Sequence, residues 1–131
     1  MNSITAADAA EAGLRAGLGR VSIDKVPIAD GGDGTLDCIA AAVKSERVKK
    51  RVEDPLGRRR TADYLLIDNG KTAVVEMARA SGLALLAPGE RNPIEATSIG
   101  TGRLINDALD RGVKKIIVGI GGSATNDGGA G

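Results

Sequence analysis

Two glycine-rich segments contain the residues of this sequence that are best suited to chemistry. Residues 29–35 read Ala-Asp-Gly-Gly-Asp-Gly-Thr, and residues 121–131 read Gly-Gly-Ser-Ala-Thr-Asn-Asp-Gly-Gly-Ala-Gly. Each segment follows an apolar run expected to form a strand. Glycine allows several backbone N–H groups to approach one anion, and a helix N-terminus beyond such a loop adds partial positive charge. In an open parallel sheet, ligands bind beyond the carboxyl ends of the strands. The two segments therefore predict a shared phosphate-binding region.

Three carboxylates lie in these segments, namely Asp30, Asp33 and Asp127. A carboxylate repels phosphate unless Mg²⁺ lies between them or the carboxylate acts as a base on a hydroxyl group. The pattern therefore predicts phosphoryl transfer to an alcohol, with Asp127 and Asp30 as the candidate catalytic residues and Asp127 as the candidate magnesium ligand. The alternative for both residues is helix capping, with the Gly-Gly pairs forming tight turns.

Other polar groups around these carboxylates complete the candidate site. The predicted phosphate- or substrate-binding positions are Gly31, Gly32, Gly121, Gly122, Ser123, Thr125 and Asn126. Arg91 is predicted to hold a substrate carboxylate in a bidentate fork, the alternative being a solvated loop arginine. Local turns are the alternative for the hydroxyl and amide side chains. Glu76, at the end of an expected strand, suggests only a surface charge.

The composition excludes several functional classes. The chain has no His, which excludes Ser-His and Cys-His couples and His-based zinc sites within it. Tyr64 is the single aromatic residue and the net charge is +1, so neither nucleic acid nor an anionic membrane is an expected partner. The single cysteine, Cys38, cannot form an internal disulfide, which favours a cytoplasmic location. No apolar run approaches the roughly 18 residues of a membrane span.

Hydrophobic periodicity predicts the elements that position these residues. Residues 3–45 read as helix, strand and helix, with the strand over 21–28 and the second helix over 36–43. Residues 46–77 read as an antiparallel β-meander, with turns at 54–57 and at Asn69-Gly70. Residues 78–97 read as loop, and residues 98–131 as a helix, a central strand over 115–120 buried on both faces, and a glycine-rich loop. The predicted class is α/β, with a partial parallel, Rossmann-like sheet, flanking helices and the meander.

Four segments in this order resemble motifs of the bacterial glycerate kinases. They are residues 26–35, 76–83, 91–102 and 119–129, which together span most of the chain. The resemblance implies a kinase that phosphorylates D-glycerate with ATP and Mg²⁺, on two α/β domains enclosing a cleft. Asp33 stands where that family more often has Glu, and Ile99 where an aromatic residue is common. Met1-Asn2-Ser3 stands in place of an opening strand and a loop that contains a lysine.

The resemblance further implies that the chain is an N-terminal fragment of a two-domain kinase. As a fragment, it is expected to lack activity and to expose apolar surface through which it self-associates. Two alternatives come from other functional classes. A non-catalytic module could bind phosphate or a sugar acid, and a nucleotide-binding oxidoreductase domain could share the sheet. The absence of G-x-G-x-x-G between a strand and a helix counts against the oxidoreductase.

Overall fold

A computed structural model describes residues 3–131 and contains a four-stranded mixed sheet in the order β1-β2-β3-β4. Strands β1 to β3 form an antiparallel meander, and β4 lies parallel to β3. The strands are β1 (Glu46–Glu53), β2 (Arg59–Ile67), β3 (Thr72–Glu76) and β4 (Lys115–Gly119). The helices are α1 (Ser3–Leu18), α2 (Thr35–Ala42), α3 (Ala78–Ser81) and α4 (Ile99–Asp110), with 3₁₀ turns η1 (Leu83–Leu85) and η2 (Pro88–Glu90). The α/β class is confirmed, with its parallel part reduced to one strand pair.

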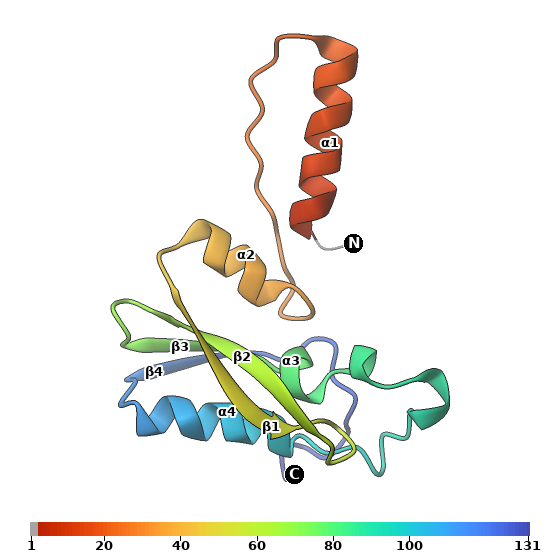
Figure 1. Cartoon of the computed structure of the whole chain (residues 1–131), viewed down its shortest axis with the longest axis vertical. Helices are drawn as coiled ribbons and strands as arrows, with labels where there is room; N and C mark the ends of the chain where they lie inside the picture. Colours follow the sequence, from red (N-terminus) through yellow and green to blue (C-terminus); the bar gives the residue numbers. More distant parts are fainter. Residues whose placement is uncertain (1–2) are drawn as a thin grey trace.

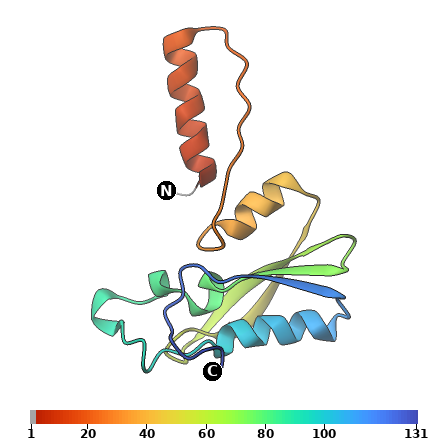
Figure 2. The same ribbon diagram turned by 180° about the vertical axis from the view of Figure 1, so that it is seen from behind.

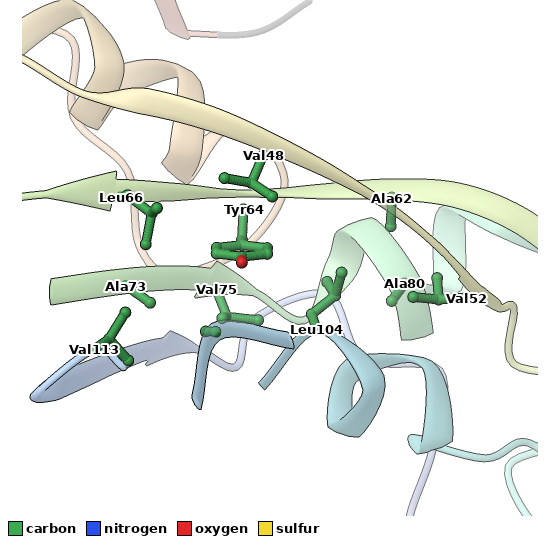
Figure 3. Close-up of a cluster of buried hydrophobic side chains, with 11 residues drawn as sticks. Val48, Val52, Ala62, Tyr64, Leu66, Ala73, Val75, Ala80, Leu104 and Val113 are labelled. Atoms are coloured by element: carbon green, nitrogen blue, oxygen red, sulfur yellow. The ribbon is translucent and has the colours of Figure 1, made fainter. Parts of the chain in front are cut away.

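Helices α2 and α4 cover opposite faces of the sheet (Figure 1). Under α4 lies the larger apolar core, in which the ring of Tyr64 is surrounded by aliphatic side chains from the strands and the helix (Figure 3). A smaller core under α2 contains Leu36, Leu65 and Val74. Alternate residues of β2 and β3 therefore enter different cores, as the two-residue period of a strand requires.

The hydroxyl group of Tyr64 is the polar end of the larger core. It donates a hydrogen bond of 2.9 Å to Asp107 of α4, which also accepts from Lys50 (2.6 Å) and Arg111 (3.0 Å). Burial and the neighbouring carboxylate raise the pKa of Tyr64 to about 12. Burial alone would raise the pKa of Asp107, but its three donors, Lys50 foremost, bring that pKa down to about 2. The network thus ties α4 to β1 and β2.

Both predicted turns of the meander are present. In the first, Gly57 has φ 81° and its N–H donates to the Asp54 carbonyl at 3.0 Å. In the second, the two positive φ angles that define a type I′ turn fall on Asp68 (53°) and Asn69 (54°). The N–H of Gly70 closes that turn onto the Ile67 carbonyl at 3.0 Å. The hairpin is therefore as predicted, with its centre one residue earlier than Asn69-Gly70.

The predicted strand over residues 21–28 does not form. This segment runs antiparallel to α1 and stands away from the sheet (Figures 1 and 2), where no neighbouring strand supplies a hydrogen-bond ladder. Val26 and Ile28 are 74% and 78% exposed, and α1 has no buried residue. Lys25 holds the segment to the helix through Asp8 and Glu11, at 2.7 and 2.8 Å. Of the segment Met1-Asn2-Ser3, residues 1–2 lie outside the described residues.

Within residues 3–131, β4 is neither central nor buried on both faces. Among the described residues β4 pairs only with β3, so it forms an edge of the sheet. Ile116 packs against the core under α4, whereas Ile117 and Val118 are 41% and 38% exposed. The continuous apolar run thus predicted the strand correctly, but it did not predict which strands lie beside it. The expected exposed apolar surface is present here, while self-association through it stays a prediction.

Two glycines in the first turn of α4 differ in what surrounds them. A Cβ atom on Gly100 would overlap the carbonyl oxygen of Glu53 in β1, whereas a Cβ on Gly102 would meet nothing within 4 Å. We expect Gly100→Ala to lower the free energy of unfolding by about 2 kcal/mol or more, because the backbone cannot give way. Gly102→Ala is expected to raise it by roughly 0.5–1 kcal/mol through helix propensity. Urea denaturation of both variants tests this prediction. Equal effects on the free energy of unfolding would contradict the close contact between Gly100 and Glu53.

Candidate functional site

Three of the segments that resemble kinase motifs, 26–35, 76–83 and 119–129, meet at the carboxyl ends of β3 and β4, and the segment 91–102 joins them through Ser98, whose N–H donates to Asp127. The N–H of Met77 donates to the Gly119 carbonyl at 2.9 Å, and that of Leu83 to the Gly122 carbonyl at 2.8 Å. The N–H of Ala124 returns a bond of 2.9 Å to the Ser81 carbonyl. The loop after β4 is therefore bound along the chain that follows β3, and both views show it passing α3 (Figures 1 and 2).

The two glycine-rich loops touch backbone to backbone. The N–H of Gly121 donates to the Gly31 carbonyl at 3.0 Å. A Cβ atom on Gly121 would lie 2.6 Å from the Gly32 nitrogen, and one on Gly119 would lie 2.6 Å from the Gly31 oxygen. Side chains at these positions would push the loops apart. The structure thus brings together the two segments predicted to share a region, and close packing already accounts for several of their glycines.

Glu76, at the end of β3, is a buried anchor and not a surface charge. Its side chain is 1% exposed, and its carboxylate accepts N–H bonds from Gly34 (3.3 Å) and Leu36 (2.8 Å) at the start of α2. The Nε of Arg79 lies 3.2 Å from the same carboxylate. The negative charge therefore faces the partial positive end of α2 and fixes the first glycine-rich loop to the sheet.

Asp127 anchors the N-terminus of α4 in a similar way. Its Oδ2 accepts the Ser98 N–H at 2.7 Å, and its Oδ1 accepts the Gly129 N–H at 2.9 Å and the Thr125 hydroxyl at 3.1 Å. Burial would raise the pKa of Asp127, but these donors, led by the backbone N–H groups, lower it to about 2. The loop after β4 is thereby tied to the N-terminus of α4, which Thr97 supports by accepting the Ile99 N–H at 3.2 Å.

Comparison with known proteins agrees with this arrangement. The sequence model described as "Glycerate kinase family" matches residues 1–131. The chain belongs to the glycerate kinase family. It is 50% identical over 131 residues to a glycerate kinase of Halalkalibacterium halodurans, covering all of this chain and 34% of that protein. It is 47% identical over 125 residues to the glycerate 2-kinase of Escherichia coli, covering 95% of this chain and 33% of that protein.

A solved structure shows the same fold. The crystal structure of a Salmonella typhimurium LT2 protein assigned as glycerate kinase 2 matches with a TM-score of 0.76 and 47% identity, covering 98% of this chain and 34% of that one. The chain therefore spans about a third of the length of the glycerate kinases it matches. No helix among residues 3–131 is long and apolar enough to cross a membrane.

The remaining predicted site residues fall into two groups in this glycerate kinase segment. Close to the junction of the loops, the Asp30 carboxylate accepts the Gly32 N–H at 3.0 Å, and the Ser123 hydroxyl accepts the Thr125 N–H at 3.1 Å. These are local turns of the kind considered as the alternative. Arg91 and Asn126 are exposed, and Arg91 lies just after η2, outside the junction of β3 and β4.

The described residues contain no protein-only metal cluster. Residues 3–131 contain no group of three acidic, Cys or His side chains close enough to hold a metal ion. Both oxygens of Asp127 already accept hydrogen bonds from protein donors. Mg²⁺ in kinase sites is usually held by one or two carboxylates together with waters and substrate phosphates, and does not need a protein-only cluster. Asp127 as a magnesium ligand therefore stays a prediction.

Proposed function

We propose that this segment forms part of an ATP-dependent kinase that transfers the γ-phosphoryl group of ATP to a hydroxyl group of D-glycerate. The observation that carries the proposal is that all four motif segments are joined near one end of the sheet, by the bonds between residues 77 and 119, 83 and 122, 31 and 121, and 98 and 127. Ligands of α/β sheets bind at such carboxyl ends. Catalysis is proposed for the full-length protein, since the chain spans about a third of its relatives.

In the proposed reaction, a hydroxyl oxygen of glycerate attacks the γ-phosphorus of ATP. Its proton passes to a carboxylate, the bond from phosphorus to the bridging oxygen breaks, and ADP leaves with that electron pair. Asp127 and Asp30 are the proposed carboxylates, and the backbone N–H groups of the two glycine-rich loops are the proposed phosphate donors. Asp127 as a magnesium ligand stays a prediction.

The single cysteine favours a cytoplasmic location.

A kinase assay with two forms of the protein tests the proposal. We expect a full-length protein containing this segment to release ADP from ATP only when D-glycerate is present. The 131-residue chain alone is expected to show no turnover, because phosphoryl transfer depends on groups positioned from several loops. Binding of D-glycerate without turnover by the full-length protein would favour the non-catalytic binding module. Turnover by the 131-residue chain would contradict the proposed need for the longer protein.

A further inference from the structure

A cavity of about 390 Å³ opens beside the junction of the glycine-rich loops. It lies between the start of α2, the start of β2, the end of β3 and the chain around α3 and η1. Its charged and apolar walls include Asp33, Asp37, Arg60, Glu76, Arg79 and Leu85. The volume lies within the range of roughly 300–1,000 Å³ that is usual for small-molecule sites. A second cavity of about 410 Å³ lies at the other end of the sheet, beside the Asp68-Asn69 turn, away from the motif segments.

Most charges in this wall already have protein partners. Asp37 accepts hydrogen bonds from Arg47 and Arg79, both at 2.7 Å. Glu76 accepts the two backbone N–H groups that start α2 and pairs with Arg79. These two carboxylates are therefore compensated by two guanidinium groups and a helix N-terminus.

Arg60 and Asp33 differ from these groups because neither forms an ion pair among residues 3–131. The Nε of Arg60, like that of Arg79, is buried without a hydrogen-bond partner, but only Arg79 has carboxylates beside it. Asp33 is exposed at the cavity rim, where a Cβ atom on Gly122 would come within 3.2 Å of its Oδ2. A buried guanidinium N–H without an acceptor carries a free-energy cost that an anionic ligand would remove. A carboxylate can accept two parallel hydrogen bonds from a guanidinium group.

We propose that this cavity binds a small hydroxy acid, with Arg60 holding its carboxylate and Asp33 accepting a hydrogen bond from one of its hydroxyl groups. The proposal rests on the proposed function, because it places the acceptor substrate of that reaction. It replaces Arg91 as the carboxylate anchor, since Arg91 is exposed outside the junction of β3 and β4. Leu85 and Ala78 supply the apolar wall for the carbon chain of such a ligand.

Steady-state kinetics of the full-length kinase test the role of Arg60. We expect Arg60→Gln to raise the KM for D-glycerate roughly tenfold to a hundredfold, the effect of losing hydrogen bonds to a charged group. The kcat and the KM for ATP are expected to change less than threefold, which is the pattern of lost ground-state binding. Arg59→Gln is the matched control, because Arg59 is the exposed neighbour in β2 and does not line the cavity. An unchanged KM in a folded Arg60→Gln variant would overturn the proposal and leave the kinase function standing.

Calorimetric titration of D-glycerate into the same proteins separates this proposal from the proposed function. Binding by the wild type that weakens at least tenfold in Arg60→Gln supports the cavity even where no phosphorylation is found. Wild-type binding that Arg60→Gln leaves intact overturns the cavity assignment, as does the absence of binding by the wild type. Arg60→Lys keeps the charge without the planar fork, and it provides the same comparison should Arg60→Gln fail to fold. Asp33→Asn is expected to weaken binding less than Arg60→Gln, because it keeps one oxygen acceptor.

Discussion

Replacing Glu76 with glutamine is expected to lower the free energy of unfolding by about 3 kcal/mol, the scale found when one partner of a buried ion pair is removed. The carboxylate of Glu76 is 1% exposed, and both of its oxygens accept backbone N–H bonds from the start of α2. The amide of glutamine offers one oxygen and directs an NH₂ group at the second N–H donor. Arg79 also loses its nearest charge partner on β3.

Urea denaturation followed by circular dichroism measures this effect. Glu46→Gln provides the control, because Glu46 is an exposed glutamate at the start of β1 and makes no ion pair among residues 3–131. The control is expected to change stability by less than about 0.5 kcal/mol. A Glu76→Gln variant as stable as the control would show that the loop does not depend on this carboxylate.

The largest kinetic effect is expected from Asp127→Asn in the full-length kinase. We expect kcat to fall about a hundredfold or more with a modest change in KM, the pattern of an interaction made only in the transition state. Asparagine keeps the shape of the side chain but removes the charge that accepts the N–H groups of Ser98 and Gly129. The amide oxygen that remains can still accept one of these N–H groups, so the loop keeps part of its attachment to α4 and KM is expected to change little.

Asp30→Asn is the comparison for that variant. The Asp30 carboxylate accepts one local N–H bond, from Gly32, so its loss is expected to lower kcat less and to act partly through stability. Both variants are best assayed below their melting transitions, because Asp127→Asn weakens the bonding at the start of α4, a loss of about 1 kcal/mol for a helix cap, and Asp30→Asn weakens a local turn. Near-normal kcat in Asp127→Asn together with loss of activity in Asp30→Asn would reverse the assignment. Normal kcat in both would restrict these carboxylates to capping.

The sequence by itself determined the local elements and the family. The type I turn at 54–57, the type I′ turn at 67–70, the stripe of α4 and the three strands of the meander depend on residues close together in the chain. Such signals survive in any environment, because turn geometry and side-chain periodicity are local properties. The four motif segments were recognised for the same reason, since their order and spacing are visible without coordinates.

Only the tertiary structure decided which elements have neighbours and which charges are buried. Residues 21–28 have the apolar pattern of a strand but meet no ladder, and the apolar run of β4 lies at a sheet edge, because strand pairing depends on residues distant in sequence. The sequence position of Glu76 suggested a surface charge. In the structure, the N-terminus of α2, 40 residues earlier in the chain, lies against its carboxylate. Arg79 lies beside Asp37 and Glu76 whereas Arg60 has no ion pair among residues 3–131, a difference that composition and spacing do not specify.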